Sequence, residues 1–395
     1  MATFLTGDVI ADRMLAHLTD EVTFIPRINS QYSSEFAGKG ARVGSSVRVR
    51  KPQRAKIRYG RIMDETPIND QYINVNLDDQ IGVDVGANSA DLALNIDDFD
   101  AQYIKPFARD LAVAIDAWAI RKVLPQVPET VGDLGAITMD KVLQAGERLD
   151  YNLAPKADRT LLVTPGTQRQ AVTAFSGLFN NQATIGKQYT RGRMANDTLG
   201  FDWYSSTMMP TLTRGTANGG YLVNGANQGG SSLIVDGGTG TIKKGDTFTI
   251  AGVFAVHPQT KESLGYLREF TVTTDYTPGG AGTLQITPEL IPTGTEQNVT
   301  AAPADNVALT VEGTSGGIYE QNLAFARDLA YFVTADMPLP KNMEAAGQRT
   351  LDGIRLRYIQ GYDITNDRWQ SRFDIIAGAG ILYPEYGVRL PIART

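Results

Sequence analysis

Few residues of this sequence have the types and spacing that catalysis or metal binding requires. The chain has two histidines, His17 and His257, in segments that look unrelated. An isolated histidine is more often a surface or packed residue than a catalytic base or a ligand. The absence of cysteine excludes disulfides, thiolate metal sites and cysteine nucleophiles. Histidine-based or cysteine-based chemistry therefore has no support.

Carboxylates are the remaining candidate metal ligands. They are Asp78 with Asp79, Asp97 and Asp98 with Asp100, and the single Glu385. A site for a hard cation needs further oxygen ligands at set spacings, which these segments lack. The second cluster has a simpler explanation, because negative charge is favourable ahead of an expected helix and its N-terminal dipole. We expect no bound metal and no cofactor.

The segment Gly240–Thr247 (GTIKKGDT) is only superficially similar to a phosphate-binding loop. Asp246 stands where that motif has its cation, and a carboxylate repels phosphate. The flanking residues have the period of strands and no helix follows, so we interpret residues 243–246 as a turn. No nucleophile elbow, dinucleotide fingerprint or zinc-protease pattern occurs. The sequence thus predicts a protein that is not an enzyme.

One charge pattern could form a contact surface. Its residues are basic along one limb and acidic near the turn: Arg48, Arg50, Lys51, Arg54, Lys56, Arg58 and Arg61, then Asp64 and Glu65. A nucleic-acid site would interleave aromatic residues with the basic ones, and only Tyr59 does so. A solvated strand face is the simplest alternative. A basic limb beside an acidic turn suits ion pairing between subunits better.

The composition indicates several packed units without nucleic-acid-binding character. The chain has 395 residues, 42% of them hydrophobic, which suits two or three units. Its net charge is -6 and its pI is about 5.2, values that argue against a strongly basic nucleic-acid-binding protein. The N-terminal segment holds Asp8, Asp12 and Arg13 and is not a signal peptide. No apolar run approaches the roughly 18 residues of a membrane helix, so we expect a soluble chain made in the cytoplasm.

The first half of the chain alternates helical and strand patterns. Residues 8–18 predict an amphipathic helix with nothing nearby to cover it, so it must dock on something distant or on another subunit. An irregular arm follows, and then a period of two predicts a long hairpin with limbs near 47–59 and 73–85. Further along, the pattern predicts helices at 106–124 and 138–150, the latter capped by Thr138, and a buried strand at 159–164 that leads to a helix from Pro165.

Between Leu212 and Gly317 the texture changes to short β-rich runs separated by Gly, Pro, Asp and Asn. This pattern predicts a small all-β domain, a barrel. A helix is expected near Tyr319–Arg327, followed by strands at 331–333, 354–359 and 369–376. The fold class is therefore α+β, with an all-β insert.

The order of these parts resembles the tailed-phage major capsid proteins of the Hong Kong 97 fold. Within them it is most similar to the podophage coat proteins of the Salmonella-phage group, which carry an inserted β-barrel. The likeness rests on Ser46–Pro52, Pro106–Leu124, Leu199–Pro210, Thr241–Val256 with Glu269–Pro288, and Tyr383–Leu390. It implies an N-terminal arm (1–45), an E-loop hairpin (46–86), a peripheral domain (87–135), the first part of an axial domain (136–211), an inserted barrel (212–317) and return strands (318–395).

The resemblance also implies a function. Such proteins form hexamers and pentamers that close into an icosahedral shell around double-stranded DNA, without reading its sequence. We expect a scaffolding protein, because only an arm precedes the E-loop, as well as a portal protein and a decoration protein. The uncovered helix and hairpin would be completed by neighbouring subunits. The chain would be made in the bacterial cytoplasm and end in the virion.

The charged residues of the hairpin would then be E-loop contacts to a neighbour. Phe107, Leu111, Ile115 and Trp118 would bury the spine helix of the peripheral domain. The acidic loop that bridges capsomers in the subgroup corresponds here to Asn224–Gly230, which is short and uncharged. No lysine–asparagine crosslink can be assigned. One alternative is a β-rich tail or adhesion protein that binds carbohydrate through the insert. Tryptophans would stack on the sugar, and Trp203 is the single tryptophan near the insert. The other alternative is a hydrolase with paired carboxylates, and no motif supports it.

Overall fold

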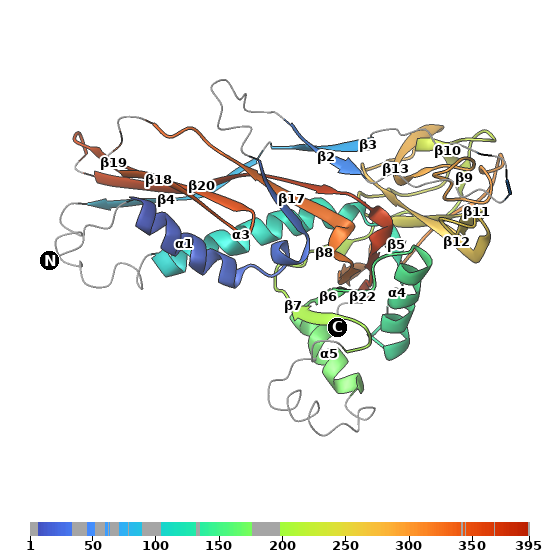
Figure 1. Ribbon diagram of the computed structural model, residues 1–395. Helices are drawn as coiled ribbons and strands as arrows, with labels where there is room; N and C mark the ends of the chain where they lie inside the picture. The colour runs from blue at the N-terminus through green and yellow to red at the C-terminus, as the bar shows by residue number, and fades with distance from the viewer. Residues whose placement is uncertain are drawn as a thin grey trace. The chain divides into compact units, whose positions relative to one another are not determined.

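The computed structural model describes residues 7–33, 46–51, 60–61, 63, 71–77, 79–88, 104–131, 135–175, 198–340, 343, 345–366 and 368–393. They form two compact units (Figure 1). The first contains Met1–Arg50, Tyr72–Ile120 and Ala330–Gly380, and the second contains Lys51–Gln71, Arg121–Leu329 and Ile381–Thr395. None of the helices in these residues has the length and apolar character that crossing a bilayer requires.

The first unit is built on a six-stranded sheet. Five strands follow the order β1-β17-β20-β19-β18. The sixth strand, β4, pairs with Arg368–Ala377 of β20 on the side opposite β19. The strands are β1 (Asn29–Ser33), β4 (Asp79–Asn88), β17 (Ala330–Ala335), β18 (Ala345–Leu351), β19 (Ile354–Asp363) and β20 (Arg368–Ile381). Alternate residues of β19, namely Ile354, Leu356 and Tyr358, are buried, as expected for a strand with one covered face, and Phe373 of β20, opposite Tyr358, is buried as well.

Helix α3 (Lys105–Val123) is the long helix of this unit, and it confirms the prediction for residues 106–124. Pro106 lies in its first turn, where the missing N–H costs nothing. The three- and four-residue spacing places Ala108, Leu111, Ile115 and Ala119 on one face, and each is at most 1% exposed. The helix therefore buries one stripe, as a helix lying on a sheet must.

Helix α1 (Gly7–Glu21) confirms the predicted N-terminal helix, and its contacts decide between the two alternatives for its cover. Its apolar face is buried within its own subunit, against β18 and β19. Because these strands lie more than three hundred residues away in the sequence, a local reading could not find them. Of the two alternatives for the cover of this helix, docking on a distant part of the chain is confirmed, and completion by a neighbouring subunit is wrong.

The returning limb of the predicted hairpin ends earlier than expected, at Asn76. Strands β2 (Ser46–Lys51) and β3 (Gln71–Asn76) form a two-stranded sheet. The residues that were expected to continue the returning limb form β4 instead, with Val83 opposite Phe373 and Val85 opposite Ser371 of β20. The period of two continues from β3 into β4, so the sequence does not show where one sheet ends and the other begins.

The second unit contains a five-stranded sheet with helices packed against it. The sheet has the order β5-β21-β16-β6-β7, with strands β5 (Glu129–Thr130), β6 (Thr160–Val163), β7 (Asp202–Ser205), β16 (Leu323–Phe325) and β21 (Gly387–Arg389). Helix α4 (Met139–Tyr151) begins at Thr138, whose hydroxyl accepts a hydrogen bond from Lys141 N at 3.3 Å. Helix α5 (Pro165–Phe175) follows β6 directly. Both predictions for residues 138–175 are confirmed.

An all-β domain is inserted into this unit. It consists of β9 (Tyr221–Val223), β10 (Gly230–Gly237), β11 (Thr247–Val256), β12 (Ser263–Val272), β13 (Gly282–Leu290) and β14 (Leu309–Val311) in the order β14-β11-β12-β13-β10-β9. A bridge between Leu222 and Ala308 joins the two outer strands, and Val223 N donates to Val307 O at 2.9 Å. The sheet therefore closes on itself, and its core is one apolar cluster that includes Phe248 and Phe270.

The chain enters and leaves the barrel through adjacent strands. β8 (Thr211–Thr213) and β15 (Ile318–Glu320) pair antiparallel, and β22 (Ile392–Ala393) pairs with β15. The helix expected near Tyr319–Arg327 is wrong, because β15, β16 and a short 3-10 turn occupy these residues. Leu323, Ala324 and Phe325 are all buried in a central strand, and such a short apolar run has no period that separates strand from helix. The α+β class with an all-β insert is confirmed.

Candidate assembly surfaces and the barrel junction

The base of the β2–β3 hairpin carries the described part of the basic limb. Arg48 is exposed, and its guanidinium lies 4.7 Å from the centre of the Tyr72 ring. Arg61 is exposed as well. Arg50 and Lys51 belong to β2, and only their backbone is described. The remaining predicted contact residues, Arg54, Lys56, Arg58, Asp64 and Glu65, lie outside the described residues.

The hairpin base packs closely on its own subunit. A Cβ added to Gly378 of β20 would meet Asn76 O at 2.6 Å and a Val75 methyl at 2.9 Å. Gly380 also lies against Val75, which is 3% exposed. Because Gly378 and Gly380 have no side chains, the hairpin base can pack directly against the backbone of β20.

The residues predicted to bury the long helix lie at different depths. Leu111 and Ile115 are fully buried, whereas Phe107 and Trp118 are half-buried. The Trp118 indole N–H donates to Asp79 Oδ2 at 2.7 Å, and its ring contacts Phe332 edge to face at 6.4 Å. Asp79, one of the carboxylates weighed as a metal ligand, thus has a structural partner.

Asp116 is a structural residue of this helix whose role the sequence did not reveal. It is 2% exposed, and its carboxylate accepts hydrogen bonds from Thr23 N and Thr23 Oγ1 at 2.9 and 2.7 Å. Phe24 N and Ile25 N donate to the same carboxylate at 3.0 and 3.2 Å. One buried carboxylate therefore anchors the backbone that follows α1.

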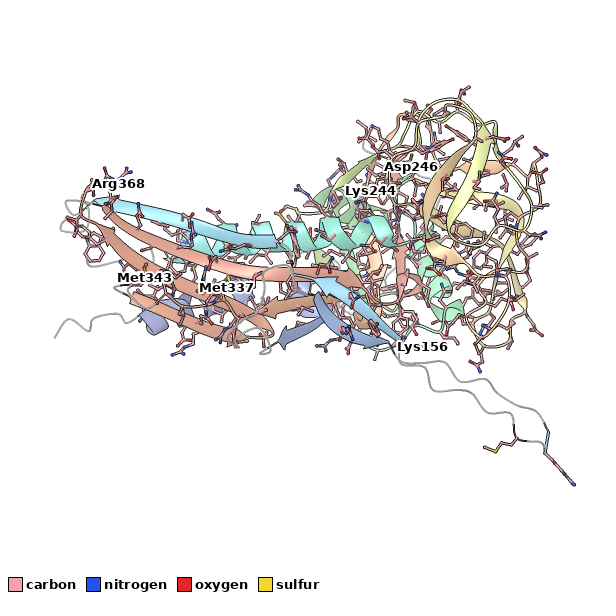
Figure 2. All side chains as sticks on the ribbon, turned by 90° about the horizontal axis from the view of Figure 1, so that it is seen from above. Lys156, Lys244, Asp246, Met337, Met343 and Arg368 are labelled. Atoms are coloured by element: carbon pink, nitrogen blue, oxygen red, sulfur yellow. The ribbon has the colours of Figure 1, made fainter. Side chains whose placement is uncertain are left out.

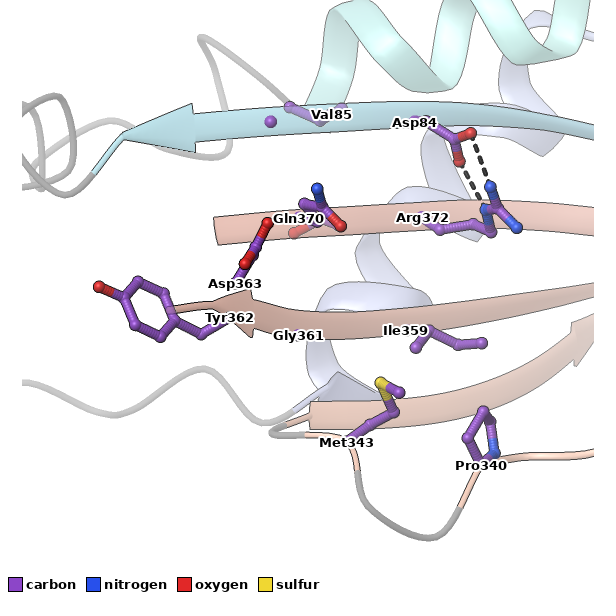
Figure 3. Close-up of a pocket in the computed structure, with 12 residues that line it drawn as sticks. Asp84, Val85, Pro340, Met343, Ile359, Gly361, Tyr362, Asp363, Gln370 and Arg372 are labelled. Atoms are coloured by element: carbon purple, nitrogen blue, oxygen red, sulfur yellow. Dashed lines mark hydrogen bonds and ion pairs between the residues drawn. The ribbon is translucent and has the colours of Figure 1, made fainter. Parts of the chain in front are cut away.

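A groove of about 690 Å³ lies on the sheet of the first unit (Figure 3). Asp84 and Arg372 form a two-pronged ion pair on its floor, with N–O distances of 2.7 and 2.9 Å. Met343, Pro340 and Ile359 line its other side, and Tyr362 lies near one end. Met343 and Arg368 lie toward the same end of the sheet, with Met337 farther along (Figure 2). The groove is polar on one side and apolar on the other.

The junction between the barrel and the five-stranded sheet is the most polar buried region of the second unit. Arg389 of β21 is 2% exposed and donates to Gly245 O at 2.8 Å and to the hydroxyls of Thr247 and Thr271 at 2.8 and 3.0 Å. Burial lowers the pKa of Arg389 to about 10. One arginine of the sheet thus binds a turn and two strands of the barrel.

Edge strand β5 meets the barrel through two glutamates. Arg268 NH1 donates to Glu129 Oε1 at 2.7 Å, and both side chains are buried. Glu269 accepts a hydrogen bond from Thr130 N, and the hydroxyls of Thr130 and Thr247 lie 3.2 Å apart. Burial and the neighbouring Glu129 and Glu312 raise the pKa of Glu269 well above its usual value. Barrel strands β11 and β12 therefore cover the edge of this sheet.

The turn at residues 243–246 belongs to the same junction. Asp246 is 1% exposed, and its Oδ2 accepts from Lys243 N at 2.8 Å and from Gly215 N at 3.0 Å. Lys244 and Asp246 lie together at this end of the barrel (Figure 2). A cavity of about 20 Å³, roughly one water molecule in size, is lined by Arg214, Asp246, Gln321 and Arg389. The predicted turn is confirmed, and its aspartate closes the turn.

One family model matches part of the chain. Residues 229–391, from just before β10 to just past β21, match the family model described as P22 coat protein, gene protein 5. No curated protein matches the chain.

Solved structures show weaker likenesses. A chain of Mycobacterium phage Che8 has 11% identity and a TM-score of 0.45, covering 91% of this chain and 88% of its own. The capsid of cyanophage P-SCSP1u has 14% identity and a TM-score of 0.44, covering 95% and 90%. The CUS-3 coat protein I-domain has 26% identity and a TM-score of 0.19, covering 23% of this chain and 94% of its own.

Proposed function

We propose that this chain, a tailed-phage major capsid protein whose residues 229–391 match the P22 coat family, closes its shell through repeated weak contacts between copies. The family match is the observation that carries this conclusion, and it confirms the resemblance drawn from the order of sequence motifs. The protein is a structural component of the virion shell and not an enzyme. A tail or adhesion role has no comparable support.

The architecture supports this role. The barrel enters and leaves the second unit through the paired strands β8 and β15, so it is an insertion on a mixed helix-and-strand core. Such an insert changes the surface of a subunit without interrupting its core. The predicted division into arm, E-loop, peripheral, axial, inserted and return segments is part of the proposal.

We propose that the contacts form hexamers and pentamers of an icosahedral shell. The hairpin is the proposed contact element, because its base is packed closely on β20 and its sequence carries charges of both signs. Its residues Arg48, Arg50, Lys51, Arg54, Lys56, Arg58, Arg61, Asp64 and Glu65 would pair with charges on a neighbour. Exposed ion pairs of this kind are individually weak, and repetition over a shell makes them sufficient.

Other partners follow from the same role. A scaffolding protein would guide assembly, a portal protein would occupy one vertex, and a decoration protein would bind the outer surface. The packaged double-stranded DNA would meet a chain of net charge -6, which does not attract phosphate. Synthesis in the bacterial cytoplasm completes the proposal.

The test is expression of the full chain with the neighbouring genes of its genome, followed by sedimentation and negative-stain microscopy. Closed shells of uniform size are expected. Fibres, tail-like tubes or only monomers with every neighbouring gene present would overturn the proposal. A variant that cannot fold, such as Ile115→Asp, is the control for aggregation, because it should give no regular particle.

A further inference from the structure

Glu269 occupies an unusual position for an acidic residue. It is 6% exposed, and its hydrogen-bond partner is the backbone N–H of Thr130. Among the ion pairs of the described residues, Arg268 pairs with Glu129 and no cation pairs with Glu269. A buried carboxylate without a cation is costly, and such a group becomes neutral instead.

The groups around Glu269 reinforce this conclusion. They come from β5, α4, β12 itself, the segment after β14, β21 and the turn before β11: Glu129, Arg148, Tyr266, Arg268, Glu312, Arg389 and Asp246. Arg148 and Arg389 attract the ionised form of Glu269, but burial and the two glutamates outweigh Arg148, and the pKa of Glu269 remains raised. Arg268 binds Glu129, Arg389 donates to neutral oxygens of the barrel, and Arg148 lies 3.3 Å from the centre of the Tyr266 ring.

The environment of Glu129 gives a second reason for Glu269 to be protonated. Its Oε1 accepts from Arg268, but its Oε2 is buried without a hydrogen-bond partner. A carboxyl proton on Glu269 would bring a donor into a region that has an unsatisfied acceptor. Ionising Glu269 would instead place a second negative charge beside Glu129.

We propose that Glu269 is a proton-linked latch, which holds the barrel against β5 while its carboxyl group is neutral and loosens this contact when it ionises. The latch lies within one subunit, so it operates in the unassembled chain as well as in a shell. It therefore stands or falls independently of the shell-forming role.

The direction of the pH effect follows from the raised pKa of Glu269, which burial causes first and the neighbouring Glu129 and Glu312 second. A group whose pKa is higher in the closed junction stabilises that junction fully below its ordinary pKa. This stabilisation is lost as the pH rises through the raised value. The opening equilibrium should therefore increase with pH, by up to about tenfold per pH unit for one released proton.

Hydrogen exchange of the Thr130 amide measures the opening, because this N–H donates to Glu269. We would record exchange of the full chain between about pH 5 and pH 9, the range from the ordinary pKa of glutamate to that of deeply buried ones. Rates would be corrected for the chemical exchange of an unstructured peptide at each pH. Amides of β13 (Gly282–Leu290) serve as the internal reference for global unfolding.

The matched variants are Glu269→Gln and Glu289→Gln. Glutamine keeps the size and acceptor of Glu269 but cannot ionise, so its Thr130 exchange should become independent of pH. Glu289 is exposed on the same barrel, and its variant should keep the wild-type slope. Equal slopes in the wild type and Glu269→Gln would overturn the proposal.

Infrared spectroscopy of the wild type gives a readout that needs no folded variant. A protonated carboxylic acid has its own carbonyl band, and the closed junction should show one at neutral pH that disappears at high pH. Absence of that band, or a Thr130 exchange rate that stays flat with pH in the wild type, would also refute the latch.

Discussion

Arg268 and Glu129 form a buried ion pair between residues 139 positions apart, with an N–O distance of 2.7 Å and side chains 5% and 0% exposed. Arg268 belongs to the barrel and Glu129 to the edge strand of the five-stranded sheet. Because both charges have left water, each depends on the other for compensation. The pair therefore links the barrel to the edge of the sheet.

Removing one partner should be far more costly than replacing both. Arg268→Ala leaves Glu129 as an unpaired buried carboxylate, and we expect a loss of about 3–5 kcal/mol in the free energy of unfolding. The double variant Arg268→Met with Glu129→Leu should recover most of this loss. Denaturant unfolding of the three proteins measures both effects, and an equal loss in the single and double variants would contradict the pairing.

An exposed ion pair provides the matched comparison. Arg372 and Asp84 have the same N–O distance of 2.7 Å, but their side chains are 53% and 64% exposed. Arg372→Ala should therefore cost only about 0.2–1 kcal/mol, since water and salt screen exposed pairs. A loss as large as that of Arg268→Ala would mean that burial does not decide the strength of these pairs.

Asp116 should control whether the N-terminal segment stays attached. Asp116→Ala removes the acceptor for the N–H groups of Thr23, Phe24 and Ile25. Each buried donor left without an acceptor costs about 1–3 kcal/mol. We expect the segment around α1 to become sensitive to protease while the barrel stays resistant, as followed by mass spectrometry of the fragments. Asp110→Ala, an exposed change on the same helix, should leave the wild-type cleavage pattern.

Two substitutions of Trp118 distinguish the stability that its packing contributes from the stability that its hydrogen bond contributes. Trp118→Ala loses its contacts with Phe332 and its N–H bond to Asp79, and should cost about 3–5 kcal/mol of stability. Trp118→Phe keeps an aromatic ring and loses the hydrogen bond to Asp79, which should cost about 1 kcal/mol. Calorimetry of both variants tests this order, and unchanged melting of Trp118→Ala would exclude the placement.

Local patterns in the sequence were enough to predict most elements. The spacing of apolar residues identified α1 and α3, and Thr138 identified the start of α4 because a cap acts within one turn. The buried strand predicted at 159–164 is β6, Thr160–Val163. Each of these features depends only on residues that are close together in the sequence, so a single sequence is enough to predict it.

Features that depend on distant residues could not be predicted. Nothing near Ile10 or Leu15 shows that β18 and β19 cover them, so the helix looked incomplete. The junction combines Glu129, Arg268 and Arg389 from three separate segments. Each looks like an ordinary charged residue in its own window, and only the folded chain removes them together from water.

Two glycines of the first unit should respond differently to the same substitution. Gly378→Ala places a Cβ 2.6 Å from Asn76 O, so we expect a loss of about 1–3 kcal/mol through overpacking at the hairpin base. Gly86→Ala has its nearest neighbour at 4.0 Å, and the lower chain entropy of alanine should leave stability unchanged or slightly higher. Thermal unfolding distinguishes the two, and a reversed order would place the hairpin base elsewhere.

The basic limb of the hairpin should act in assembly and not in folding. Reversing Arg54 and Arg58 to Glu turns the proposed attractions to a neighbouring subunit into repulsions, and we expect the subunit itself to keep its stability. We expect an unchanged melting temperature and a reduced yield of shells in sedimentation, with a smaller defect at high salt because salt screens exposed charges. The variant with both residues changed to Lys keeps the charge and should assemble as the wild type does. Normal shells from the Glu variant, or equal defects in the Lys and Glu variants, would remove charge pairing as the role of this limb.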